Sequence, residues 1–125
     1  MSKIQIGITA AVQINYIKLL INSLNHLAKN PDNLEFLIGV DTGPGKGNID
    51  LSWFQKRKYK LIKYNTKTPY SSMGHGMLMD KLLEHMDSEF GMFMDSDVCF
   101  LKKNWDEIFL NEMEKSNLTY IGTES

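Results

Sequence analysis

The chain has 125 residues, a formal net charge of −1 and 23% charged residues. A chain of this length can bury its own core as one domain over residues 1–125, and its near-neutral charge argues against nucleic acid as a partner. The single cysteine, Cys99, excludes an internal disulfide and suits a reducing compartment. Because no segment is long and apolar enough to span a bilayer and the N-terminus is unlike a signal peptide, we expect a cytoplasmic protein.

The first predicted elements are a strand and a helix. Residues 3–9 alternate and are rich in β-branched side chains, which predicts a strand. Apolar residues then recur at i, i+3, i+4 and i+7, the spacing of one face of a helix. These residues are Ile17, Leu20, Ile21, Leu24, Leu27 and Ala28. Asn15 is suited to cap this helix and Asn30-Pro31 to stop it.

A second strand is predicted over residues 34–40 and ends at Asp41. The glycine-rich loop over residues 42–48 follows. It matches neither a P-loop nor a dinucleotide fingerprint, and it follows the second strand instead of the first, so we interpret it as a flexible turn. Ser52 and Gln55 have capping-box spacing, which predicts a short helix after this loop.

The second half of the chain repeats the alternation. Strands are predicted over residues 59–64 and 90–94, with a polar loop over residues 65–73 and a helix between them. The apolar face of that helix comprises Met77, Leu78, Leu82, Leu83 and Met86. A last helix has capping residues Asn104 and Glu107 and inward-facing Trp105, Ile108, Phe109 and Met113, and residues 118–122 predict a final strand. The alternation indicates an α/β fold with mostly parallel strands and helices on both faces of the sheet.

Two carboxylates follow the strand at residues 90–94. Asp95 and Asp97 are spaced i, i+2, so in an extended segment they point to the same side. The carboxyl ends of parallel strands are where open α/β sheets bind ligands. Paired carboxylates there suit Mg²⁺ or Mn²⁺, and such a cation suits a diphosphate. The alternative is that the two aspartates only end the strand and begin a turn.

Two more groups are candidates for binding. Asp41 could accept hydrogen bonds from a base N–H or a ribose hydroxyl, or it could cap the loop that follows. A second group is predicted to lie just before a helix, where N–H groups attract anions and glycine lets a ligand approach. Its members are Ser71, Ser72, Gly74, His75 and Gly76. His75 could contact phosphate or sugar or ligate a metal, or it could be a structural residue.

Taken together, these parts resemble the nucleotide-binding half of a GT-A glycosyltransferase of family 2 type. Three segments carry the resemblance in the same order as in that family. They are Ile8-Thr9-Ala10 followed by Asn15-Tyr16, then Val40-Asp41-Thr42-Gly43, then Ser72-Met73-Gly74-His75-Gly76 with Leu78 and Asp80 ahead of Phe93-Met94-Asp95-Ser96-Asp97. The resemblance covers nearly the whole chain and implies a single-domain, Rossmann-like GT-A sheet, truncated relative to full-length members.

The resemblance also implies residue roles. Thr9 and Asp41 would hold the nucleobase and ribose, Asp95 would contact the ribose or the cation, and the segment from Ser72 to Asp80 would line the donor sugar. Asp97 would bind the Mn²⁺ or Mg²⁺ ion that bridges the two phosphates. The implied nucleotide- and sugar-binding residues are Thr9, Ala10, Asp41, Ser72, Gly74, His75, Gly76, Asp80, Asp95 and Ser96, and the implied metal ligands are Asp95 and Asp97.

The chain departs from the family pattern in three ways. Ala10 cannot stack on a base, and Met77 stands near where the family commonly has an arginine. Family members are also much longer, and their second half builds the acceptor site and supplies the general base, which must reach the acceptor hydroxyl. No catalytic residue is assigned here, and Glu124 is the best stand-in for the base. A homo-oligomer could complete such a site.

Three hypotheses follow. The first is a metal-dependent glycosyltransferase-like protein that binds a nucleotide-diphosphate sugar, with a UDP-sugar favoured, and transfers the sugar to an unknown acceptor or slowly hydrolyses it. The second is a catalytically incomplete nucleotide-sugar-binding module that lacks its acceptor half. The third is a nucleotidyltransferase-type domain, which would need a glycine-rich, cationic loop after its first strand. Residues 9–13 contain neither a glycine nor a cation, which argues against the third hypothesis.

Overall fold

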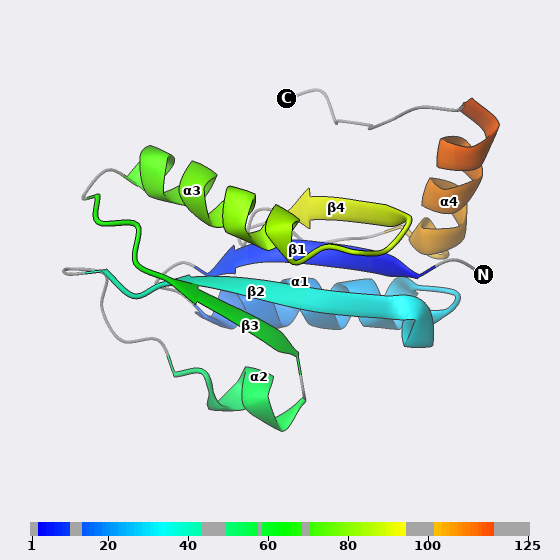
Figure 1. The fold of residues 1–125 in the computed structure, drawn as a ribbon. Coiled ribbons are helices and arrows are strands. Elements are labelled where there is room, and N and C mark those ends of the chain that lie inside the picture. The colour runs from blue at the N-terminus through cyan, green and yellow to red at the C-terminus, as the bar shows by residue number, and fades with distance from the viewer. Residues whose placement is uncertain are drawn as a thin grey trace.

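The described strands form one fully parallel sheet. The computed structural model describes residues 3–10, 14–43, 50–57, 59–68, 71–94 and 102–116. Its strands are β1 (Ile4–Ala10), β2 (Leu34–Asp41), β3 (Lys60–Tyr64) and β4 (Phe90–Met94). They pair in the order β3-β2-β1-β4, so β1 and β2 are central (Figure 1). The mostly parallel α/β sheet predicted from the alternation of elements is confirmed.

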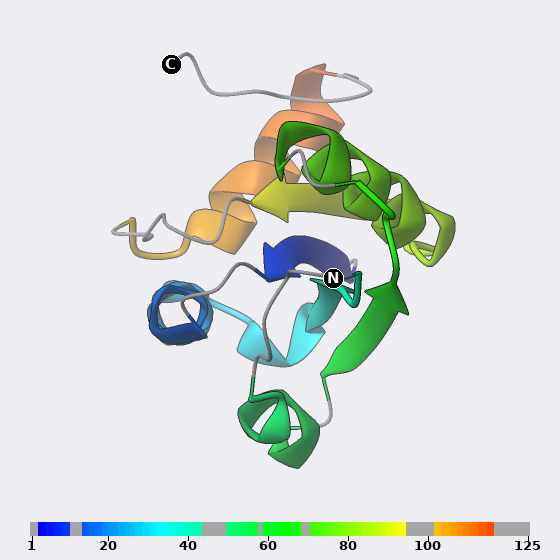
Figure 2. The same ribbon diagram turned by 90° about the vertical axis from the view of Figure 1, so that its left-hand side faces the viewer.

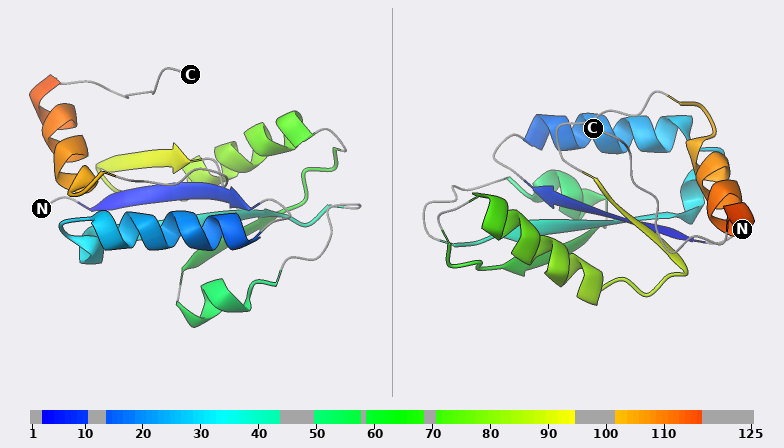
Figure 3. Two further views of the ribbon diagram at one scale, coloured as in Figure 1. Left: turned by 180° about the vertical axis from the view of Figure 1, so that it is seen from behind. Right: turned by 90° about the horizontal axis from the view of Figure 1, so that it is seen from above.

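Helices cover both faces of this sheet. They are α1 (Ile14–Leu27), α2 (Ser52–Lys56), α3 (Ser71–Glu84) and α4 (Trp105–Ser116), with a short 3-10 turn η1 (Pro31–Asn33) ahead of β2. Figures 2 and 3 show α1 and α3 on opposite sides of the sheet. Among the described residues, no helix is both long enough and apolar enough to cross a membrane.

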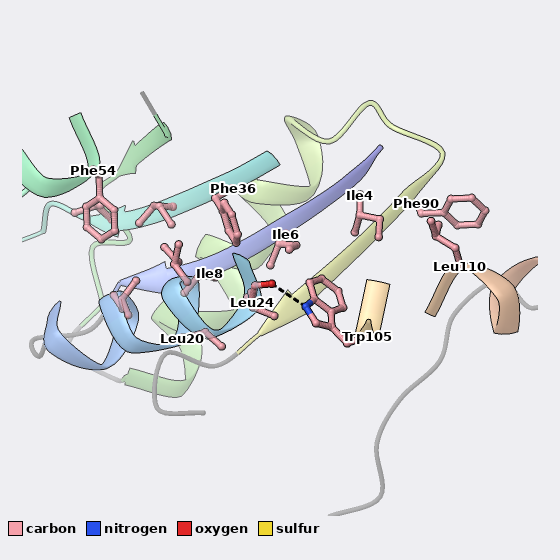
Figure 4. Close-up of a cluster of buried hydrophobic side chains, with 14 of the residues drawn as sticks. Ile4, Ile6, Ile8, Leu20, Leu24, Phe36, Phe54, Phe90, Trp105 and Leu110 are labelled. Carbon is pink, nitrogen blue, oxygen red and sulfur yellow. Dashed lines mark hydrogen bonds between the residues drawn. The ribbon is translucent and has the colours of Figure 1, made fainter. Parts of the chain in front are cut away.

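The main core lies between the sheet and α1. Side chains at alternate positions of a strand point to the same face, and β1 directs Ile4, Ile6 and Ile8 toward α1 (Figure 4). The apolar stripe of α1 meets them, as its helical spacing predicts. The fully buried members of this stripe are Ile17, Leu20, Ile21 and Leu24.

The opposite face of the sheet is thinner and carries polar groups. A small cluster of Leu37, Ile62 and Leu82 packs there against α3. Gly39 lets α3 come close, since a Cβ at this position would lie 3.3 Å from Leu82. The other positions of β1 and β2 on this face include Gln5, Thr9 and Asp41. Their polar side chains therefore lie between the sheet and the helix or at the ends of the strands.

Helix starts differ from the predictions by a few residues. α1 begins at Ile14, so Asn15 lies inside the helix and not at its cap. The N-cap of α2 is Leu51 and not Ser52. The N–H of Ser52 donates to the Asp50 carboxylate at 3.0 Å. α3 begins at Ser71, within the segment predicted as loop. The N–H groups in the first turn of a helix have no partner within the helix. The apolar periodicity of the later turns therefore does not identify the first residue of the helix.

Three side-chain assignments on α3 and α4 were also wrong. Leu83 and Ile108 are 58% and 43% exposed, whereas Leu110 is buried. Glu107 does not form a capping box but pairs with Lys29, with its Oε2 2.5 Å from Nζ. The predicted strand at residues 118–122, Cys99 and residues 44–48 of the glycine-rich loop lie outside the described residues.

A buried glutamine joins the amino-terminal end of β1 to the turn before β4. Gln5 is fully buried, and its Oε1 accepts the N–H groups of Asp87 and Ser88 at 2.7 and 2.9 Å. Its Nε2 donates to Asp87 Oδ1 at 2.8 Å and to Glu35 Oε1 at 3.2 Å. A hydrogen bond from Lys3 is the main reason why the pKa of Glu35 is lowered. The amide of Gln5 therefore satisfies groups from two other segments, β2 and the turn before β4.

Replacing Gln5 with leucine is expected to destabilise the fold by about 2–4 kcal/mol, because two backbone N–H groups lose their acceptor and each costs about 1–3 kcal/mol when buried. Urea unfolding followed by circular dichroism measures this loss. Gln55→Leu is the matched control, since Gln55 is exposed on α2 and should change stability little. Equal midpoints for the Gln5 and Gln55 variants would contradict the assigned role of the buried amide.

Candidate functional site

The carboxyl ends of the four parallel strands meet at one edge of the sheet. In the strand register, Ala10 lies opposite Val40, and Asp41 lies opposite Tyr64. On the other side of β1, Met94 of β4 lies opposite Ile8. The amino-terminal half of α3 reaches the same edge, where it contacts Thr9 and Asp41, as described below. The topology thus gathers the candidate residues of β1, β2 and α3 in one place.

Asp41 is the most constrained acid at this edge. Its Oδ1 accepts the N–H of Gly43 at 2.9 Å and the N–H of Thr66 at 3.3 Å. Its Oδ2 accepts the hydroxyl of Thr66 at 2.6 Å. A carboxylate accepts hydrogen bonds at about four positions, so these contacts fix its orientation while the side chain stays half-buried. The Gly43 contact also shows that Asp41 organises the loop after β2, one of the two roles predicted for it.

Gly74 lies on the side of α3 that faces this carboxylate. A Cβ at Gly74 would lie 3.4 Å from both Asp41 Oδ2 and Thr66 Oγ1, which is ordinary van der Waals contact. Glycine inside a helix costs about 1 kcal/mol relative to alanine, and these distances leave room for alanine here. Alanine could therefore replace this buried glycine without a clash.

Thr9 and His75 connect β1 to α3. The Thr9 hydroxyl lies 2.9 Å from His75 Nδ1, and Thr9 is 8% exposed. Which of the two donates depends on the imidazole tautomer. This contact gives His75 a structural role, which was one of the interpretations proposed for this residue. It also places the imidazole at the same edge as Asp41.

The remaining predicted residues are distributed as follows. Ala10 is partly buried at the end of β1, while Gly76 and Asp80 are exposed on α3 and no described atom lies within 4 Å of a Cβ built at Gly76. Ser72 lies in the first turn of α3. Residues 74–76 thus lie within the helix and not before it, so the unpaired N–H groups of its first turn belong to earlier residues. Asp95, Ser96, Asp97 and Glu124 lie outside the described residues.

Thr66 was not predicted from the sequence. It is 3% exposed and donates twice to Asp41 across 25 residues of sequence. Its position two residues after the end of β3 is the only sequence signal that could have drawn attention to it.

No metal site is formed by the part of the chain that the structure describes. That part contains no group of three His, Cys, Asp or Glu side chains placed to hold an ion. The oxygens of Asp41 accept protein hydrogen bonds, and Nδ1 of His75 contacts Thr9. The predicted metal ligands Asp95 and Asp97 lie outside the described residues, so this pair stays a prediction.

Comparisons with known proteins give the fold. No protein-family model and no curated protein matches the sequence. Among solved structures, S. aureus TarS 1–349 matches with a TM-score of 0.72 at 18% identity over 98% of this chain and 38% of that one. Its complex with UDP-GlcNAc gives 0.66 at 17% identity over 98% and 37%. The mannosyltransferase PcManGT from Pyrobaculum calidifontis, in complex with GDP-Man and Mn²⁺, gives 0.57 at 12% identity over 82% and 30%.

These matches concern one part of larger proteins, because the chain spans 38% of the length of TarS 1–349. At such identities they show the arrangement of helices and strands and not the activity. The all-parallel sheet with helices on both faces agrees with the fold expected from the resemblance. The chain therefore has a GT-A-like α/β fold.

Proposed function

We propose that this chain binds a nucleoside diphosphate sugar, with a UDP-sugar favoured, at the carboxyl edge of its sheet and acts as a glycosyltransferase. The observation that carries the proposal is the Asp41 carboxylate, held in place at that edge beside Thr9 and α3. A fixed carboxylate selects ligands that present hydrogen-bond donors, such as ribose hydroxyls or the N–H of a base. In this proposal Thr9, Ala10 and Asp41 hold the nucleoside.

The solved structures support a nucleotide ligand of this kind. TarS was crystallised with UDP and with UDP-GlcNAc, and PcManGT with GDP-Man and Mn²⁺. Uracil and guanine donors both occur among these proteins, so our preference for a UDP-sugar rests on the higher TM-scores of the TarS structures. The base is therefore a variable in the experiment below.

The diphosphate is assigned to the segment that follows β4. Asp95, Ser96 and Asp97 come directly after Met94 in the sequence, and Met94 ends β4 at the same edge of the sheet as Ala10 and Asp41. Two carboxylates one residue apart suit Mn²⁺ or Mg²⁺. When bound, the cation would neutralise charge on the departing nucleoside diphosphate. Asp95 and Asp97 would hold it, with Ser96 beside the nucleotide.

The sugar is assigned to the exposed side of α3. Gly76 and Asp80 are one helical turn apart and both exposed, and Gly76 presents bare backbone. Gly74 and His75, on the side of α3 that faces Asp41 and Thr9, and Ser72 in its first turn are the other residues proposed to bind the sugar. Glu124 stays the suggested general base for an acceptor of unknown chemistry, and assembly of a homo-oligomer is a proposed way to complete the acceptor side.

Thermal denaturation with nucleotides tests the proposal. We expect UDP with Mn²⁺ to raise the melting temperature, since a ligand at a hundredfold excess over its Kd adds about 2.7 kcal/mol of stability. UDP alone, Mn²⁺ alone, and GDP, CMP and ADP with Mn²⁺ are the comparisons. A shift that needs one diphosphate and the metal supports the donor site and identifies its base. No shift with any pair would refute the proposed function.

A nucleotide-sugar-binding module without transfer activity is the second candidate. This chain spans 38% of the TarS 1–349 chain, and binding of a donor does not itself require an acceptor site. A product assay with UDP-GlcNAc separates the two candidates. A glycosyltransferase or slow hydrolase releases UDP above background, whereas a module binds the donor and releases none.

A further inference from the structure

Thr66 lies in the loop after β3 and has no role in the proposed function so far. We propose that it is a positioning residue of the nucleoside site, which orients the Asp41 carboxylate toward the ligand. This inference rests on the proposed function, because Asp41 is the group assigned to the nucleoside. It concerns a residue that the strand-end motifs of the sequence do not include.

The contacts between the two residues are the first argument. Thr66 donates its N–H to Asp41 Oδ1 at 3.3 Å and its hydroxyl to Oδ2 at 2.6 Å. One residue therefore contacts both oxygens of one carboxylate. The hydroxyl contact is short, as hydrogen bonds to an ionised group are, and such bonds are about twice as strong as neutral ones. At 3% exposure Thr66 is shielded from water, so a water molecule does not easily replace it.

The freedom of an aspartate side chain is the second argument. The terminal torsion of Asp is broad, so a single hydrogen bond leaves the plane of the carboxylate free to turn. The N–H of Gly43 holds only Oδ1. The hydroxyl of Thr66 holds the other oxygen and so fixes the plane. A Cβ at Gly74 of α3 would lie 3.4 Å from Asp41 Oδ2 and from Thr66 Oγ1, the two atoms of this hydrogen bond.

A purely structural role for Thr66 makes a different prediction. If the hydroxyl only anchored the loop after β3, its loss would lower stability and leave the affinity of the folded protein for UDP unchanged. If it acts through Asp41, the two residues are coupled. The effect of removing the Thr66 hydroxyl should then vanish once the Asp41 carboxylate is gone, because residues that act together are not additive.

The experiment is a double-mutant cycle read by isothermal titration of UDP in the presence of Mn²⁺. We expect Thr66→Val, which keeps the shape and removes the hydroxyl, to weaken UDP binding on the order of tenfold, the value of one hydrogen bond to a charged group. Thr66→Ser should restore most of the affinity. Asp41→Ala/Thr66→Val should bind no more weakly than Asp41→Ala alone. Thr42→Val, the same change at an exposed neighbour of Asp41, should leave binding unchanged.

Each outcome decides between the roles. Wild-type affinity for the folded Thr66→Val protein would overturn the inference, and so would an equal loss in the presence and absence of the Asp41 carboxylate. Either result leaves the proposed function standing, because the wild type still binds UDP. Absence of binding of every tested nucleotide with Mn²⁺ by the folded wild type would refute the proposed function and this inference with it. Circular dichroism checks the fold of each variant, and Thr66→Ala serves if the valine variant does not fold.

Discussion

Replacing Asp97 with asparagine is expected to abolish the Mn²⁺-dependent part of UDP binding and to leave the fold intact. The asparagine has nearly the same size but no charge, and hard divalent cations prefer carboxylate oxygens. The loss should be at least about a hundredfold, because even the outer-shell partners of metal ligands contribute about 10- to 100-fold to metal affinity. Titration of UDP with and without Mn²⁺ measures the difference between the two conditions.

The control for this variant removes one negative charge elsewhere. Asp32 is exposed in the 3-10 turn η1, far along the chain from the proposed metal ligands. Asp32→Asn should bind UDP and Mn²⁺ like the wild type. Metal-dependent binding that survives in Asp97→Asn would show that the aspartate pair is a strand-end turn, which was the alternative interpretation of the pair. The glycosyltransferase proposal would then rest on the shared fold alone.

The sheet could be predicted because its signals are local. β2 and β4 are short, largely apolar segments that end at or just before an aspartate, and parallel pairing follows from the helices between the strands. The first strand shows this clearly, since Ile4, Ile6 and Ile8 all face the α1 side as their alternation predicts. The predicted strand ends at Asp41 and Met94 were also correct, because the apolar residues of each strand stop at an aspartate.

The exposed surface of the helices could not be predicted as well. Leu83 continues the apolar pattern of α3, but only Leu78 and Leu82 are buried. Periodicity defines an apolar face, whereas burial depends on what another element places opposite it. Ile108 and Leu110 of α4 show the same limit, because their burial depends on how α4 meets α1 and β4 and not on their own spacing.

The candidate site shows a third case. Asp41, Thr9 and His75 were named from motifs, and the structure brings them to one edge. Thr66 was missed because its partner lies 25 residues earlier, and a threonine after a strand is common. The contact depends on the register of β2 with β3, where Asp41 lies opposite Tyr64. Register is set by the whole sheet, so this contact becomes visible only in three dimensions.

The amino-terminal end of α4 supports the second large prediction, which concerns stability. Trp105 is 3% exposed, and its Nε1 donates to the carbonyl oxygen of Leu24 at 2.9 Å (Figure 4). On either side of it, the Asn104 N–H donates to Leu27 O at 2.7 Å, and the Asp106 carboxylate accepts the N–H groups of Lys29 and Asn30. Helix ends leave such groups unpaired, so these three residues secure the carboxyl end of α1 and the turn after it.

Trp105→Ala is expected to reduce the free energy of unfolding by about 3–5 kcal/mol, the cost of truncating a large buried aromatic residue. This is a large share of the roughly 5–15 kcal/mol that stabilises a typical domain. Trp105→Phe should cost less, since it keeps an aromatic ring in the core and removes mainly the hydrogen bond to Leu24. Urea unfolding followed by circular dichroism measures both variants under the same conditions.

Trp53→Ala separates the effect of this position from the general effect of losing a tryptophan. Trp53 is only partly buried on α2, where Arg57 lies over its ring at 3.9 Å from the centroid. Its removal should cost clearly less than that of Trp105, because part of its surface already faces water. If the two alanine variants unfold at the same urea concentration, α4 does not hold α1 to the sheet in the way its contacts indicate. A much lower midpoint for Trp105→Ala, with Trp105→Phe in between, would show that the core and the end of α1 depend on this one side chain.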